Sequence, residues 1–359
     1  MLAASTLDRR SILWRLGVIG GVGAASLGGF LYAGAWIGPA RLTPRRFVDR
    51  FEQIFKRNPG FRRNHAKGVS ASGYFTSNGA GTELSRASVF APGRTDVIGR
   101  FSLSGGAPMA SDAPDTVRGL GLRFDLPGGE EWRTAVVNTP VFLDRVPEGF
   151  FARILASKPD PKTGKPDPAA MAEFLTAFPE TARAMAYVKQ HPASSGFENS
   201  TFYGLNAFWF TNGAGSSVPV RWRFVPRDPV TPAGGAHPPG RDYLFRALID
   251  RAGAGPLRWD LHLIVGRPGD PTDDATRPWP PDRRVVTAGT LTLDALQTEA
   301  AGNARDVNFD PLVLPSGISP SDDPLLSARS AVYAESYTRR SGEPKSPSAV
   351  VVPGGHHGA

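Results

Sequence analysis

The sequence predicts an α+β fold built around an antiparallel β-sheet or barrel. Segments with the alternating pattern of β-strands fill the first two-thirds of the chain, and helical periodicity returns near its end. A hydrophobic fraction of 40% over 359 residues provides enough apolar side chains for a real core and excludes a wholly disordered chain. No internal repeat is visible. We therefore expect one large domain, over residues 41–345, after an N-terminal segment.

The first element is an apolar segment, residues 16–40, that contains no charged residue. It is about 25 residues long, enough to span a bilayer, and Arg9, Arg10 and Arg15 precede it. Its glycines are common in membrane helices and disfavoured in soluble ones. Residues 1–40 are therefore either an uncleaved membrane anchor or a signal peptide cleaved after the small residues 33–35. Both interpretations place the domain in the periplasm or another extracytoplasmic compartment.

The helices that follow are predicted from apolar spacing and from capping residues. Residues 43–57 place phenylalanines at helical intervals after Thr43, a candidate cap. Two helices are predicted over 167–178 and 180–191, with a proline at their junction. A last helix is predicted over 321–340, with Ser321 or Asp322 as its cap.

Strands are predicted where apolar and polar residues alternate. They cover residues 65–75, 97–104, 120–126, 132–143, 204–211, 218–225 and 257–266. Two segments rich in Pro and Gly, 226–240 and 267–284, are predicted to be loops, and residues 346–359 a flexible tail.

Composition excludes several classes of function. The chain has no cysteine, which rules out disulfides, thiolate-bound zinc, iron–sulfur clusters, a catalytic thiol and thiolate-ligated haem. The net charge is +8, but the basic residues are mixed with acids and form no stripe interleaved with aromatics. We therefore expect no nucleic-acid partner. No G-x-G-x-x-G motif lies in a strand–helix setting, and no NADPH is expected.

Two groups of residues could carry chemistry. His65 lies in an extended segment beside small residues, where it could act as an acid–base near neutral pH or serve as a hydrogen-bonded structural histidine. The other histidines suit structural, loop or tail positions: His191, His237, His262, His356 and His357. On the last helix, Arg329 precedes Tyr333 by one turn and could favour the ionised form of its phenol. A tyrosinate suits ferric haem, although Tyr337, one turn further, has a similar setting.

A family resemblance connects these two groups. Residues 64–75 (NHAKGVSASGYF) resemble the distal-histidine segment of haem catalases, and residues 323–333 (DPLLSARSAVY) resemble their proximal helix. Further segments resemble the catalase sequence in the same order: 100–102 (RFS), 115–119 (DTVRG), 139–142 (TPVF), 158–163 (KPDPKT) and 290–293 (TLTL). The matches run from about residue 45 to 341. The chain is identified as a member of the haem catalase superfamily, similar in shape to the short, exported catalase-related peroxidases.

The resemblance implies a fold and a set of roles. The fold is an antiparallel β-barrel haem core with helices around it. His65 would be the distal acid–base that moves the peroxide proton, and Ser102 would orient it. Tyr333 would be the axial ligand of the iron, with Arg329 donating a hydrogen bond to its oxygen. The cofactor would be haem b, and its propionates would be held by three arginines, Arg62, Arg100 and Arg340.

Two positions depart from the family pattern. The tetrad 137–140 reads V-N-T-P where catalases have N-N-x-P, so an ungapped match puts Val137 at the position of the distal amide. Either the strand shifts by one residue and Asn138 supplies that amide, or the pocket lacks it. The second departure is Asn64, which stands where catalases usually have an apolar residue. In allene oxide synthases this position is polar, and both departures predict a poor catalase.

We therefore predict a haem peroxidase that reduces hydrogen peroxide or organic hydroperoxides with electrons from an organic reductant, and that has weak catalase activity at most. Two alternatives remain open at this stage. One is a fatty-acid hydroperoxide isomerase or lyase like allene oxide synthase, suggested by Asn64. The other is a non-enzymatic haem carrier or sensor.

Overall fold

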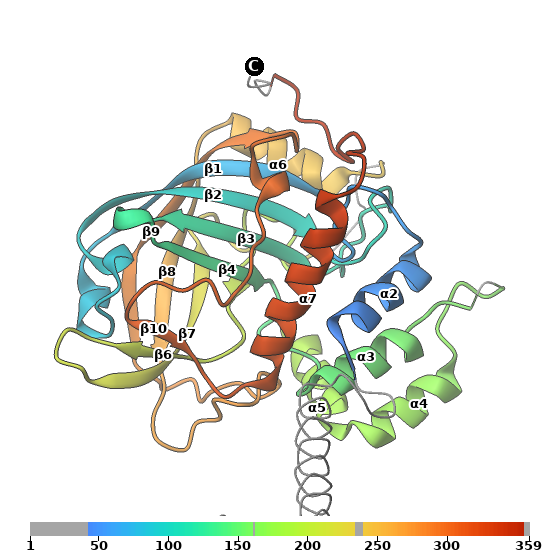
Figure 1. Ribbon diagram of the computed structural model, residues 1–359, viewed down its shortest axis with the longest axis horizontal. Helices are drawn as coiled ribbons and strands as arrows, with labels where there is room; N and C mark the ends of the chain where they lie inside the picture. Colours follow the sequence, from blue (N-terminus) through green and yellow to red (C-terminus); the bar gives the residue numbers. More distant parts are fainter. Residues whose placement is uncertain (1–41, 161, 234–239, 355–359) are drawn as a thin grey trace, which may run out of the picture.

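The computed structural model describes residues 42–160, 162–233 and 240–354. Within these residues, eight antiparallel strands close into a barrel in the order β1–β2–β3–β4–β5–β7–β8–β9, because β9 pairs with β1 and β7 with β8 (Figure 1). The short strands β6 and β10 extend the sheet from β7. The strand bounds are β1 Gly68–Ser77, β2 Gly93–Leu103, β3 Arg118–Asp125, β4 Glu131–Val137, β5 Phe202–Tyr203, β6 Phe208–Thr211, β7 Ser217–Pro226, β8 Leu257–Val265, β9 Val285–Gln297 and β10 Ile318–Pro320.

Helices surround this barrel. They are α2 Pro44–Phe55, α3 Pro147–Ala156, α4 Pro168–Ala177, α5 Pro179–Lys189, α6 Tyr243–Gly253 and α7 Pro324–Ser341. Figure 1 shows α7 crossing the outside of the barrel, with α2 beside it and α3, α4 and α5 grouped near its beginning. The predicted α+β class, an antiparallel barrel with surrounding helices, is confirmed.

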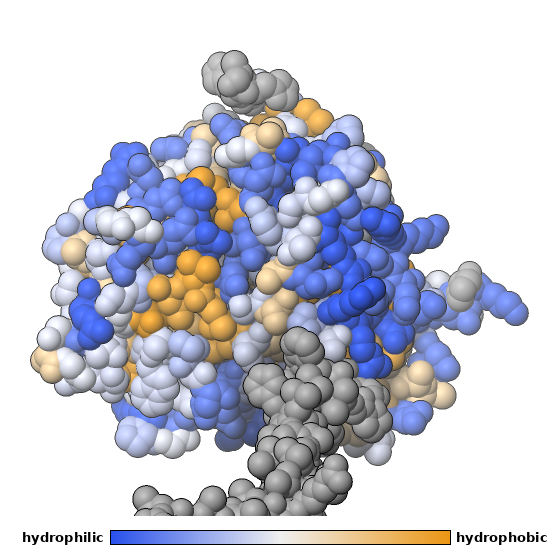
Figure 2. Space-filling model, in the orientation of Figure 1, coloured by the Kyte–Doolittle hydropathy of each residue, from blue (hydrophilic) through white to orange (hydrophobic). Residues whose placement is uncertain are grey.

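The core fills the barrel with large apolar side chains. Trp132 stacks on Phe124 at 4.8 Å and meets Trp222 edge-on at 5.3 Å, and all three rings are buried. Outside the barrel, Figure 2 shows a largely hydrophilic surface along α7 and α2, with an apolar patch beside α7 over the segment that joins β9 to α7. Leu312 and Leu314 of this segment are only partly buried, and they pack against the core.

Several observed element boundaries differ from the predicted ones. The strand expected over 132–143 ends at Val137. The last helix is capped by Asp323, whose carboxylate accepts a hydrogen bond from the Leu325 backbone at 2.9 Å, and not by Ser321 or Asp322. Helices α3 and α6 lie in segments for which no element was predicted, and β9 was suggested only by residues 290–293.

The predicted flexible tail is wrong for residues 346–354. Val350 and Val352 are buried in the core, and the Val352 backbone donates to Thr298 Oγ1 at 2.9 Å. Burial of these side chains stabilises the segment against the barrel. Residues 355–359, and the predicted export segment 1–40, lie outside the described residues. Within the described part of the chain, no helix is long and apolar enough to cross a membrane.

Candidate functional site

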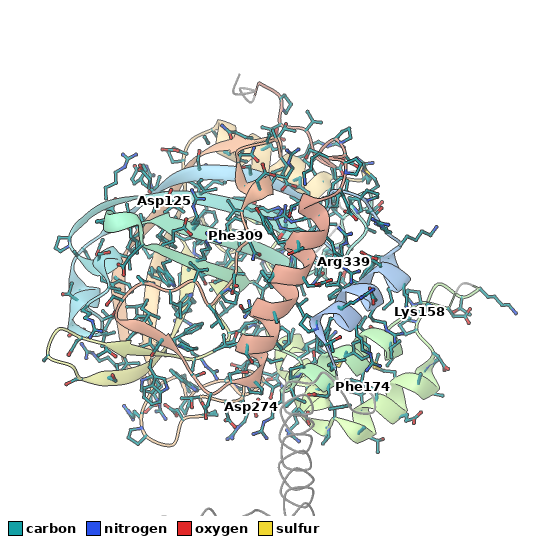
Figure 3. The ribbon with its side chains drawn as sticks, in the orientation of Figure 1. Asp125, Lys158, Phe174, Asp274, Phe309 and Arg339 are labelled. Atoms are coloured by element: carbon teal, nitrogen blue, oxygen red, sulfur yellow. The ribbon has the colours of Figure 1, made fainter. Side chains whose placement is uncertain are left out.

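The candidate site is built on the outward face of β2, β3 and β4. Adjacent residues on this face pair in register, as Ser102–Gly119–Val137 and as Arg100–Gly121–Ala135. The two glycines let other groups approach the sheet closely. A Cβ atom on Gly119 would lie 3.0 Å from the His65 ring and from Ser102 Oγ, and one on Gly121 would lie 2.8 Å from the Phe309 ring. Phe309 lies over these strands beside α7 (Figure 3).

His65 lies over this face in a backbone conformation with a φ of 57°, which non-glycine residues adopt rarely. Its Nδ1 atom lies 3.1 Å from Ser102 Oγ, in hydrogen-bond contact. The preceding side chain, Asn64, holds the turn, because its amide oxygen accepts from the backbone N–H groups of His65 at 3.0 Å and of Gly105 at 2.8 Å. The polar residue at position 64 therefore has a structural use in this chain.

The surroundings of His65 favour its neutral form. Burial, together with the positive charges of Arg100, Arg62 and Arg329, lowers the pKa of the imidazole to about 3. Since Nδ1 contacts Ser102, Nε2 is the ring nitrogen left to accept a proton. The site can thus present a neutral base near pH 7.

The three arginines predicted to hold the haem propionates converge at the edge of this face. Arg100 donates to the His65 carbonyl at 2.9 Å and to the Ala66 carbonyl at 3.2 Å. Arg62 and Arg340 both donate to the carbonyls of Arg305 and Val307, over distances of 2.5 to 3.3 Å. We call Arg62, Arg100 and Arg340 the arginine clamp.

One buried carboxylate, Glu299, accompanies the arginine clamp, and the sequence alone did not reveal it. Its oxygens accept hydrogen bonds from Arg100 Nε at 2.7 Å and Nη2 at 3.0 Å, and Arg62 Nη1 lies 3.6 Å away. Three guanidinium groups and one carboxylate leave a local net charge of +2. Burial lowers the pKa of Arg340 to about 10, with Arg100 acting in the same direction, and it also lowers the pKa of Arg62. Both pKa values are lowered because burial and neighbouring positive charges disfavour the protonated form, and one carboxylate does not neutralise three guanidinium groups.

Tyr333 faces the same region from α7. It packs against a small buried apolar cluster from the segment after β9, formed by Ala304, Val307 and Phe309. Ile98 and Ala135 pack against the same cluster. No hydrogen bond joins the Tyr333 hydroxyl to any residue that the structure describes.

The hydrogen bond predicted from Arg329 to the Tyr333 oxygen is not present. Arg329 donates instead to the Asn206 side chain at 2.5 Å and to the Ala135 carbonyl at 3.1 Å. Asn206 is buried and donates in turn to the Asp323 carboxylate at 2.7 Å. These two acceptors suit the planar fork of a guanidinium, and they tie α7 to β4. Asn206 and Asp323 were not singled out from the sequence, since only the fold brings them to Arg329.

The structure places Asn138, one of the two candidates for the distal amide position, just beyond the end of β4. The Asn138 amide oxygen accepts from the backbone N–H of Arg118 at 2.8 Å. Val137 pairs directly with Gly119, whose missing Cβ would point at His65. Paired residues of antiparallel strands share a face, so Val137 lies on the histidine side. The strand does not shift, and the face that carries His65 has valine where an amide was expected.

Comparison with known proteins identifies the family. The sequence model of the catalase family, described as "Catalase", matches residues 31–347. The chain belongs to the catalase family. The catalase-related peroxidase of Synechococcus elongatus is 41% identical over 302 residues, which cover 83% of this chain and 89% of that protein. The catalase-related peroxidase of Mycolicibacterium paratuberculosis is 31% identical over 306 residues, covering 84% and 96%. This chain is therefore an oxidoreductase that acts on peroxide.

Full-length catalases are more distant. Rat catalase is 27% identical over 322 residues, and the match covers 85% of this chain but 61% of that protein. A solved bacterial catalase superposes with a TM-score of 0.68 at 24% identity, covering 84% of this chain and 62% of the other. Catalase A of Saccharomyces cerevisiae gives the same TM-score at 23% identity. These structures support the fold.

Members of the catalase family bind haem, and the residues of this site fit that group. The arginine clamp carries a net charge of +2 with Glu299, which matches the two carboxylates of haem. The Tyr333 hydroxyl, free of other partners among the described residues, is the type of oxygen ligand that catalases give to haem iron. The apolar cluster beside Tyr333 suits a largely apolar ring.

Proposed function

We propose that this protein is a haem b peroxidase that reduces hydrogen peroxide or an organic hydroperoxide with electrons from an organic reductant. The observation that carries the proposal is the convergence, on one sheet face, of a neutral histidine and an arginine clamp of net positive charge, with Tyr333 beside them. Arg62, Arg100 and Arg340 would hold the propionates, and Tyr333 would ligate the iron.

His65 moves the proton in the proposed reaction. Its Nε2 would take the proton from one peroxide oxygen and return it to the other, which leaves when the O–O bond breaks, as water from hydrogen peroxide or as an alcohol from an organic hydroperoxide. Ser102 holds the imidazole in place through Nδ1. Haem, when bound, supplies the iron centre that gives two electrons to peroxide and later recovers them from the organic donor. The propionates would offset the charges of Arg100 and Arg62, which otherwise depress the pKa of His65.

A low catalase activity follows from the residue beside His65. Catalase turnover requires a second peroxide to be oriented as a reductant, and a valine at position 137 offers no hydrogen-bond donor for it. An organic donor that transfers electrons to the haem edge does not need that amide. The Asn64 amide oxygen accepts from two backbone N–H groups, so a structural role is enough to account for a polar residue at this position.

The experiment compares two reactions of the haem-loaded protein. Oxygen evolution from hydrogen peroxide measures catalase activity, and peroxide-dependent oxidation of a phenolic dye measures peroxidase activity. We expect fast dye oxidation with little oxygen. Turnover of a fatty-acid hydroperoxide without consumption of the dye would refute the proposal in favour of an isomerase, and absence of both activities in a haem-loaded protein would favour a carrier.

We also propose that the protein acts outside the cytoplasm, exported or anchored through residues 16–40. The support is the length of that segment and its lack of charge. Fractionation of cells that express the full chain should recover it in the membrane or periplasm. Recovery in the cytoplasm alone would refute this assignment.

A further inference from the structure

Glu299 has no part in the reaction proposed above, yet it lies in the middle of the arginine clamp. Only 7% of the residue is exposed, and both carboxylate oxygens accept hydrogen bonds from Arg100. Its closest approach to Arg62 is 3.6 Å. A buried carboxylate in a site for an anionic group is unexpected, because it occupies the same donors that the group would use and repels it.

Apart from the contact between Arg62 and Glu299, the rest of the clamp has only neutral hydrogen-bond partners. Arg62 and Arg340 donate to backbone carbonyls around the short turn Ala304–Asp306. Asp306, at the end of that turn, forms an ion pair with Arg305. Glu299 is thus the single carboxylate in contact with the clamp among the described residues. Arg62, Arg100 and Arg340 lower the pKa of this carboxyl and outweigh the effect of its burial, so it stays ionised.

We propose that Glu299 is an internal counter-anion, which keeps the arginine clamp assembled in the haem-free chain and competes with the haem propionates for Arg100 in the loaded protein. It would therefore set how tightly haem is retained. The inference rests on the proposed haem binding and goes beyond it, because it assigns a residue that opposes cofactor binding.

The two effects of Glu299 have opposite signs, and this distinguishes them from a merely structural role. Without haem, loss of the carboxylate leaves three guanidinium groups, two of them buried, with no counter-charge, and the fold is destabilised. With haem, loss of the carboxylate removes its repulsion of the propionates and frees two donors of Arg100 for them. If Glu299 only positioned Arg100, its removal would weaken both folding and haem retention.

The test uses E299Q, which removes the charge and keeps the shape. Urea unfolding of the haem-free chain measures stability, and transfer of haem to an excess of haem-free globin measures the release rate. We expect a lower urea midpoint and a haem release at least about 10-fold slower than in the unaltered chain, since the variant no longer sets a like charge against the propionates. E299D, which keeps the charge, should resemble the unaltered chain in both measurements. The matched control is E173Q, the same change at an exposed glutamate of α4.

Release at an equal or faster rate in E299Q would overturn the proposal, as would an unchanged urea midpoint. If haem-free E299Q does not fold, the variant can be loaded during expression, and slower release from that protein is still required. Failure of the unaltered chain to take up haem would instead refute the proposed function. The two failures are therefore distinguishable.

Discussion

Ser102 Oγ and His65 Nδ1 lie 3.1 Å apart, and this contact joins the rigid strand β2 to a histidine in a strained loop conformation. The strand fixes the position of the hydroxyl, since Ser102 pairs with Gly68 on one side and Gly119 on the other. Gly119 provides the space that the imidazole fills. A residue far from His65 in the sequence thus determines how its ring is oriented.

Replacing Ser102 by alanine should slow the reaction of the loaded protein with peroxide. One orienting hydrogen bond contributes about 1 kcal/mol, so we expect a decrease of roughly 5- to 10-fold without loss of haem. Stopped-flow absorbance after mixing with hydrogen peroxide measures the rate. Ser102→Thr keeps the hydroxyl and should recover most of it, and Ser104→Ala, at an exposed neighbour, serves as control. Equal rates in Ser102→Ala and the control would contradict the orienting role.

His65 should make the haem-free protein sensitive to acid. Burial and the neighbouring arginines lower the pKa of the folded-state imidazole to about 3, whereas in the unfolded chain it binds a proton near pH 6.5. Between these values the unfolded state binds more protons, so the free energy of unfolding decreases as the pH falls from about 6.5 towards 3. In His65→Gln this contribution is absent. Urea unfolding at pH 7 and pH 5 should therefore show a smaller loss of stability for the variant, and an equal loss would show that the imidazole is not held neutral.

Val137→Asn should increase catalase activity. The side chain at position 137 lies on the face that carries His65, so an amide there could orient a second peroxide molecule. We expect oxygen evolution per haem to rise by up to roughly 10-fold, the upper range for one well-placed hydrogen bond between neutral groups. An oxygen electrode measures it, with dye oxidation recorded in parallel. A variant that folds and binds haem with unchanged oxygen evolution would contradict the assignment of Val137.

Asn138→Ala tests whether the amide next to Val137 takes part in the reaction with peroxide. We expect that it does not. The Asn138 amide oxygen accepts from the Arg118 backbone, so its removal should lower stability by about 1 kcal/mol. Dye oxidation and oxygen evolution per haem should be unchanged at low temperature. A selective loss of peroxide activity would instead restore Asn138 as the distal amide.

Tyr333→Phe should lose haem or change its ferric absorption spectrum, because the phenol oxygen is the ligand that we assign to iron. The matched control is Tyr337→Phe, one turn along α7, where the ring of Tyr337 lies 4.6 Å from the Arg340 guanidinium. The control should keep the tyrosinate-type spectrum. An unchanged spectrum in Tyr333→Phe, or a changed one only in Tyr337→Phe, would transfer the ligand to Tyr337.

Sequence reasoning predicted the fold class and located the site because its motifs are local. The histidine segment and the R-x-x-x-Y helix each occupy one short stretch, so His65 and Tyr333 could be singled out without knowing the fold. The strand pattern likewise placed Ser102 on β2, where the structure has it in contact with His65.

What sequence reasoning missed depends on pairing between distant segments. Glu299 forms hydrogen bonds with Arg100, and Asn206 with Arg329. Each pair is far apart in the sequence, so only the fold shows that these polar residues belong to the site. The choice between Val137 and Asn138 needed the register of β4 against β3, since a shift of one residue reverses the face of every side chain. The tail at 346–354 contains Pro, Gly and Ser, which predict a loose segment, but Val350 and Val352 pack into the core, and that contact depends on the fold.

The most direct test of the account is the reaction of hydrogen peroxide with the haem-loaded protein before and after His65→Ala. The alanine variant should keep haem, because the assigned ligand and clamp are unaltered. Its second-order rate with peroxide, measured by stopped-flow absorbance, should fall by about 10²- to 10⁴-fold, the range for loss of a positioned proton-transfer group. A variant that holds haem and reacts as fast as the unaltered protein would contradict the central claim that His65 moves the peroxide proton.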